Sequence, residues 1–69
     1  MRIKYFEDTD TTLVELSINP PVETRELNEN IYLDLDSNGN VVSITIEHAS
    51  ASSDMREFLY QRIPAAMST

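Results

Sequence analysis

The dipeptide Asn38-Gly39 stands between two stretches in which apolar and polar residues alternate. Residues 31–36 read IYLDLD and residues 41–47 read VVSITIE. Asn and Gly both adopt a positive φ at little cost, so Asn-Gly between alternating runs is the strongest short signal for a β-hairpin. The sequence therefore predicts two antiparallel strands joined by a tight turn, and the rest of the fold has to accommodate this hairpin.

The alternation also predicts the register of this hairpin. With Asn38-Gly39 as the turn, three apolar pairs share one face, while polar side chains share the other. A four-residue loop over residues 37–40 keeps this pairing, whereas a three-residue loop would mix the two faces. The expected pairs are Leu35 with Val42, Leu33 with Ile44, and Ile31 with Ile46.

The same stretch, DLDSNGN from Asp34 to Asn40, begins like a calcium-binding loop. An EF-hand loop needs a bidentate Glu at its twelfth position, and counting from Asp34 that position is Thr45. The residues before Asp34 have the alternation of a strand rather than the pattern of a helix. The EF-hand interpretation fails on both points, and a non-EF calcium site using the Asp34–Asn40 loop remains the alternative to a plain turn.

The remaining elements are predicted from the periodicity of apolar residues and from the prolines that end strands. Residues 2–6 and 12–18 are expected to be strands, residues 22–27 a short edge strand or an extended loop, and Pro20-Pro21 ends the second strand. We predict a single α+β domain over residues 1–69, with a small antiparallel sheet of four to five strands and one C-terminal helix. Its parts are strand-rich residues 1–48, a linker at 49–53, a helix at 54–63 and a tail at 64–69.

The predicted helix carries one apolar stripe, with offsets of three, four and eight residues. A helix of about ten residues is not stable alone in water, so this stripe has to be buried against the chain's own sheet or against a neighbour. Asp54 followed by Glu57 resembles an N-cap, and Pro64 ends the helix. The stripe is the candidate interface, and its residues are Met55, Phe58, Leu59 and Ile63.

The composition limits how such a chain can be stabilised. It has 69 residues, no cysteine and one histidine, so neither a disulfide nor a typical zinc site can support a small core. Association is the remaining means, and we expect a homodimer. The net charge of −7 excludes direct nucleic-acid binding and favours a basic protein as a partner. No stretch approaches 18 apolar residues, so we expect no membrane segment and a soluble, cytoplasmic protein.

The titratable and nucleophilic residues do not form a recognisable catalytic set. His48 has no nucleophile or orienting acid beside it on the same strand face, and we expect a hydrogen-bonded histidine at the margin of the core. The serines at 50, 52 and 53 have no glycine-flanked nucleophile elbow, and Gly39 alone cannot build a phosphate-binding loop. We therefore predict no catalytic residue, no cofactor and no enzyme activity.

Two segments resemble a known bacterial family. KYFEDTDTTLVELS (residues 4–17) and YLDLDSNGNVVSITIEHAS (residues 32–50) are similar to the motifs of domain of unknown function 2283. Asp10 matches the acid of the first turn, Asp34, Asp36 and Gly39 match the hairpin, and Ala49-Ser50 matches the end of the second motif. Thr12-Leu13 replaces the usual Leu-Tyr pair, and His48 stands where an acid is common.

The resemblance implies a small β-rich fold without established catalytic residues. Genes of this family often lie beside small toxin-like genes, which implies an antitoxin-like role. From the sequence we thus expect a protein-interaction module, with neutralisation of a basic protein as its finer role. A calcium-responsive binding domain is the alternative.

Overall fold

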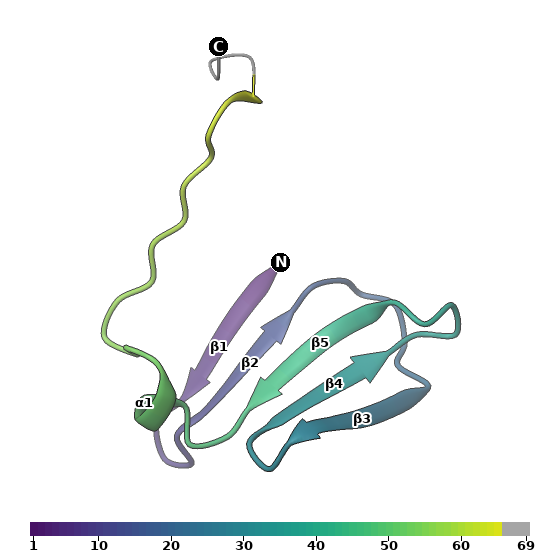
Figure 1. Ribbon diagram of the computed structural model, residues 1–69, viewed down its shortest axis with the longest axis horizontal. Coiled ribbons are helices and arrows are strands. Elements are labelled where there is room, and N and C mark those ends of the chain that lie inside the picture. Colours follow the sequence, from purple (N-terminus) through teal and green to yellow (C-terminus); the bar gives the residue numbers. More distant parts are fainter. Residues whose placement is uncertain (66–69) are drawn as a thin grey trace.

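The computed structural model describes residues 1–65, which form one five-stranded antiparallel sheet, a short helix and an extended C-terminal segment (Figure 1). The sheet order is β1-β2-β5-β4-β3, with β5 in the centre and β1 and β3 at the edges. The predicted α+β class with a C-terminal helix is therefore confirmed. The elements are β1 (Arg2–Phe6), β2 (Thr11–Glu15), β3 (Glu23–Asn28), β4 (Ile31–Leu35), β5 (Val41–Ile46) and α1 (Ala49–Ser52).

The β4–β5 hairpin has the predicted register over most of its length, but not at the turn. Ile31 pairs with Ile46 and Leu33 with Ile44, whereas Leu35 pairs with Val41 rather than with Val42. The Asp36 N–H donates to the Asn40 carbonyl at 2.9 Å, which leaves a three-residue loop. A β-bulge next to Leu35 absorbs the extra residue, and the apolar alternation continues beyond it.

The second strand is shorter than predicted, because β2 ends at Glu15 and not at Ile18. The bulge explains this end, since the carbonyl of Val42 accepts hydrogen bonds from the N–H groups of both Leu16 and Ser17, at 2.8 and 3.3 Å. This shared acceptor turns the chain away from the ladder. Residues 22–27, for which a strand and a loop were both open, contribute most of edge strand β3.

The predicted helix over residues 54–63 is wrong, and so is the predicted linker at 49–53. The helix α1 occupies that linker, and residues 57–64 have neither helix nor strand. Asp54 explains the difference: its Oδ1 accepts a hydrogen bond from the Arg56 N–H two residues on, at 3.0 Å, and its carboxylate binds the Arg56 guanidinium. Such local bonds compete with helical ones. We call residues 54–65 the C-terminal arm. Of the predicted tail, residues 66–69 lie outside the described residues.

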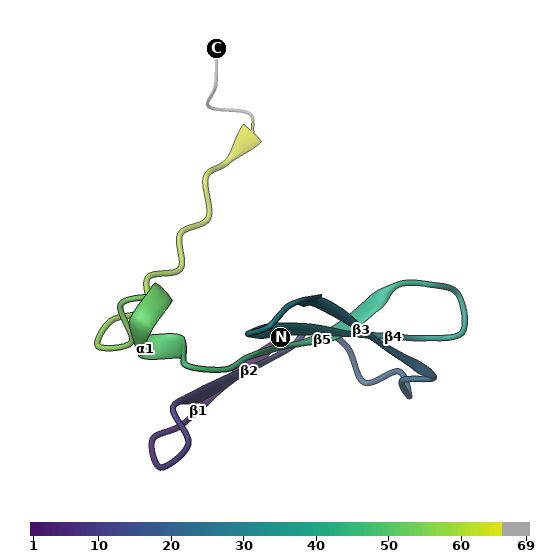
Figure 2. The same ribbon diagram turned by 60° about the horizontal axis from the view of Figure 1, so that its bottom comes forward.

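The chain forms one layer rather than two. Figure 2 shows the sheet nearly edge-on, with the arm leaving it on one side. Among residues 1–65, the buried apolar side chains are Leu35, Val42 and Ala49. Domains normally pack two or more layers around a core, so this sheet lacks a second layer over most of its surface.

Candidate functional site

One face of the sheet is apolar and largely open. We define the apolar face as the side chains that point to the same side of β1, β2, β5 and β4, as strand alternation and the pairing register place them. The five residues at its middle are only half-buried. The face comprises Ile3, Tyr5, Val14, Ile31, Leu33, Leu35, Val42, Ile44 and Ile46, and its half-buried middle consists of Val14, Ile31, Leu33, Ile44 and Ile46.

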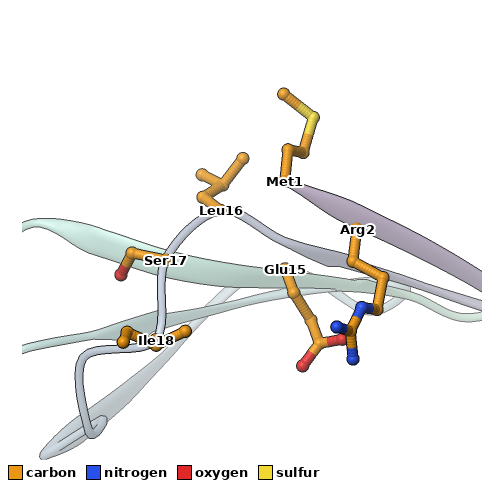
Figure 3. A pocket seen from close by; sticks show the side chains of 6 residues that line it. All are labelled: Met1, Arg2, Glu15, Leu16, Ser17 and Ile18. Atoms are coloured by element: carbon orange, nitrogen blue, oxygen red, sulfur yellow. The ribbon is translucent and has the colours of Figure 1, made fainter.

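The opposite face is polar. At the free end of β1 and β2, Figure 3 shows Arg2 and Glu15 pointing to one side of the sheet and Met1 and Leu16 to the other. Glu15 forms an ion pair with Lys4 on this polar face, with 3.2 Å between Nζ and Oε1. Met1 and Leu16 extend the apolar face to the end of the sheet.

The start of the arm lies over this apolar face. Met55 is half-buried, and the Thr12 hydroxyl lies 3.6 Å from its sulfur. Around it, the first residues of the arm and the side chains of Ile3, Val14 and Ile46 line a hollow of about 380 Å³. The first turn of the arm is therefore attached to the sheet by apolar contact.

Beyond Met55 the arm separates from the sheet. Phe58 and Tyr60 face Met1 and Ile3 across an open groove of about 640 Å³. Both aromatic side chains are 68% exposed. The arm thus presents large apolar side chains beside an apolar face without closing on it.

The predicted interface residues are not one helical stripe. Met55 and Phe58 reach the hollow over β1 and β2, while Leu59 and Ile63 do not line it and are 74% and 85% exposed. Tyr60, which was not among the predicted interface residues, lines the groove together with Phe58. In an extended chain residues two apart share a side, so the period-two pair Phe58 and Tyr60 was a signal that a helical interpretation hides.

The carboxylates of the DLDSNGN stretch are engaged by the protein itself. The Asp36 Oδ1 accepts hydrogen bonds from the N–H groups of Asn38 and Asn40, both at 2.9 Å, and its Oδ2 accepts one from the Asn19 amide at 3.2 Å. The Asn40 N–H is the main reason why the pKa of Asp36 is lowered. Asp34 accepts from the hydroxyls of Thr24 and Ser43, at 2.6 and 2.8 Å.

This geometry is that of a turn held by Asp36. Gly39 has φ +83°, the left-handed conformation for which glycine is suited. No cluster of three or more His, Cys, Asp or Glu side chains that could hold a metal ion is found within residues 1–65.

A second carboxylate, Asp10, joins the β1–β2 turn to α1. Its Oδ1 accepts hydrogen bonds from the Tyr5 hydroxyl at 2.6 Å and from the Ser50 N–H at 3.0 Å, and its Oδ2 accepts one from the Ser50 hydroxyl at 2.7 Å. Its carbonyl accepts the Ala49 N–H at 2.9 Å. The Tyr5 hydroxyl is the largest cause of the lowered pKa of Asp10, followed by Ser50. The same hydrogen bond raises the pKa of Tyr5.

These hydrogen bonds hold the β1–β2 turn against the start of α1. A serine nucleophile needs a base that takes its proton, and Asp10 is a weak base because its pKa is lowered. The sequence alone gave no local signal for the Asp10–Ser50 contact, since the two residues are 40 positions apart. Both residues do fall at positions that match the family motifs.

His48 lies after β5, in the turn before α1, rather than at the margin of the core. It is exposed and has φ +53°, and its Nδ1 is 3.0 Å from Oδ1 of Asn30. The prediction that it is hydrogen-bonded is confirmed, but its expected place at the margin of the core is wrong. Asp10 itself has φ +54°, so a left-handed residue stands at each of these two turns.

Acidic residues gather around Tyr32 near the β3–β4 turn. Glu47 is the largest cause of the raised pKa of Tyr32, and burial, Glu26 and Glu29 raise it further. Tyr32, Glu26 and Glu47 belong to the polar face by strand alternation. Acidic side chains therefore lie close together at this end of the polar face, away from the apolar one.

Comparison with known proteins places this sheet in a family. Residues 2–50 match the family described as protein of unknown function (DUF2283), and the match covers more than half of the chain. The chain belongs to this family, as the sequence motifs predicted. No curated protein and no solved structure gave a match. The matched region ends within α1, so the arm lies beyond it.

Within the part of the chain that the structure describes, no helix is long and apolar enough to cross a bilayer.

Proposed function

We propose that this chain is a protein-interaction module and not an enzyme, and that it binds through the apolar face and the C-terminal arm. The observation that carries this proposal is the open groove between Phe58, Tyr60, Met1 and Ile3, beside a half-buried apolar face. Contiguous exposed apolar surface on a small domain usually marks an interaction site. The hydrogen-bonded carboxylates at Asp10 and Asp36 support the same view, since both are used to hold turns.

Affinity capture with the purified, tagged chain from a lysate of its native host tests this proposal. Phe58→Ser should reduce the amount of bound protein, because Phe58 is an exposed apolar side chain at the groove. Phe6→Ser is the matched control, since Phe6 is 46% exposed and strand alternation puts it on the polar face. An equal loss in both variants, or no loss in either, would reject the apolar face and the arm as the binding surface.

Neutralisation of a basic protein is the finer role that we propose for this module, with the acidic residues around Tyr32 on the polar face as a second surface that meets the basic partner. The arm contains two acidic and two basic residues, so the net charge of −7 resides in residues 1–53. A basic partner would be steered to such a domain, and its binding would weaken with added salt.

The finer role is tested by co-expressing the chain with the product of a neighbouring gene that is basic and inhibits growth. The parent chain should restore growth. The double substitution Glu26→Lys and Glu47→Lys should restore it less, because it reverses the potential around Tyr32, whereas Glu26→Gln with Glu47→Gln should have an intermediate effect. Equal restoration of growth by all three chains would reject electrostatic recognition of the basic protein by the polar face.

A further inference from the structure

The following inference rests on the proposed function and names one partner of the apolar surface. We infer that a second copy of this chain covers it: two sheets pack with their apolar faces together, and the arm of each chain lies over the sheet of the other. The dimer supplies the second layer that the single chain lacks.

The surface area of the chain fits such a dimer. A compact monomer of 7.9 kDa exposes roughly 4,400 Å². This chain exposes 5792 Å², an excess on the order of 1,000 Å² over that value. A stable interface buries about 800 Å² on each partner. The radius of gyration, 14.4 Å, also exceeds the roughly 11 Å of a compact chain of this length.

The chemistry of the apolar face favours another copy of itself over a basic partner. The strands at its middle contribute uncharged side chains, and the acidic residues around Tyr32 lie on the other face. At the β3 rim of the apolar face, Glu23 and Arg25 compensate each other with an ion pair of 2.9 Å. A two-fold contact between the sheet side chains of two such faces therefore brings together uncharged residues and a paired Glu23–Arg25 rim, as an isologous interface requires.

The arm is long enough to reach the partner. Packed sheets lie about 10 Å apart, and an extended chain advances about 3.3 Å per residue. Residues 58–65 span roughly 26 Å when extended, so they can cross this spacing and still run along most of a strand of average size. The arm also carries no net charge, so it can approach the acidic domain of a second copy without repulsion.

Isotope-filtered NMR on a mixed sample tests the arrangement. Chains labelled with ¹³C and ¹⁵N are mixed with unlabelled chains, dissociated and allowed to reassociate, so that filtered NOEs report contacts between chains. We expect NOEs from the rings of Phe58 and Tyr60 of one chain to methyl groups of Leu33, Ile44 or Ile46 of the other. A dimer whose filtered NOEs involve only β1 or β3 edge residues would overturn the inference.

Two variants give a second, independent test. Phe58→Ser should raise the dissociation constant of the purified dimer more than about tenfold, because each copy loses a buried aromatic contact. Phe6→Ser, on the polar face, should leave that constant within about threefold of the parent's, since exposed positions away from the interface change little. Equal constants for parent and Phe58→Ser would contradict the inference.

The two proposals fail in different ways. If the purified chain is a monomer at every concentration while affinity capture still depends on Phe58, the second copy is rejected and the interaction module stands. If capture and self-association are both insensitive to Phe58, the module fails as well.

Discussion

The carboxylate of Asp10 accepts three hydrogen bonds, and its charge should contribute to how the fold responds to acid. Its pKa is below the ordinary value of 3.8 because Tyr5 and Ser50 donate to it. As pH falls, the unfolded chain takes up this proton first. The stabilising contribution is therefore complete above that ordinary value and is lost as pH falls through the folded-state pKa.

We accordingly expect Asp10→Asn to lower the free energy of unfolding at neutral pH and to flatten its decline in acid. Urea unfolding at a series of pH values measures both effects. Asp8→Asn is the control, because Asp8 is an exposed acid in the same turn. If both variants have the same pH dependence as the parent, the role assigned to Asp10 is wrong.

Substitution of Gly39 tests whether the hairpin turn requires a backbone conformation that favours glycine. Its φ of +83° disfavours β-branched residues, and no atom lies within 4 Å of the position that a Cβ would occupy. Gly39→Val should therefore destabilise by about 1–3 kcal/mol through backbone strain alone, whereas Gly39→Asn should cost less, because Asn tolerates this region. Chemical denaturation of the two variants gives the comparison, and equal stabilities would reject strain as the cause.

Asp36 leads to an expectation about calcium. Both of its carboxylate oxygens already accept hydrogen bonds from the protein, so a cation would have to displace these donors. We expect millimolar calcium to leave Tm unchanged, since a ligand that binds the native state raises it by mass action. A rise of several degrees with calcium, and none with magnesium, would restore the calcium-responsive alternative.

Among the elements, the strands should differ in stability according to their place in the sheet. Central β5 has a partner on both sides, while β1 and β3 are edges. We expect slow amide exchange in β5 and in the strands that flank it, β2 and β4, and fast exchange at the outward-facing amides of β1 and β3. Hydrogen exchange followed by NMR measures this order. Faster exchange in β5 than in β3 would contradict the topology.

The hairpin, the bulge and the helix show which parts of the fold could be predicted from the sequence. The β4–β5 hairpin was predictable because the alternation and the Asn-Gly signal are local and agree with each other. The bulge at Val42 was not, because it depends on Leu16 and Ser17, which follow β2 and lie far from Val42 in the sequence. The helix was misplaced for a related reason: α1 begins where Asp10, a residue far away in the sequence, accepts its first N–H groups.

The candidate site, too, could be predicted only in part from the sequence. Met55, Phe58, Leu59 and Ile63 were chosen for a helical period, and the structure leaves three of them exposed on an extended arm. Their apolar character was predictable, whereas the conformation that presents them was not, since Asp54 and Arg56 favour a local turn. Tyr60 lines the groove beside Phe58 only because the arm is extended.

At the scale of the whole molecule, the net charge predicts opposite effects of salt on the two proposed partners, a second copy of the chain and a basic protein. Two copies bring together domains of net charge −7 each, so salt should screen their repulsion and tighten self-association. Raising NaCl from about 50 mM to about 500 mM should thus lower the dimer dissociation constant and raise that of a complex with a basic protein. Parallel titrations at both salt concentrations check this, and a dimer that weakens with salt would show that ionic contacts dominate its interface.

The central prediction is that association of two chains closes the apolar face. Sedimentation equilibrium of the unmodified protein, over a dilution series down to low micromolar concentration, tests it directly. We predict a folded species of about twice 7.9 kDa that dissociates on dilution, with loss of stability as it does so. A folded species of 7.9 kDa, equally stable at every concentration, would contradict the claim.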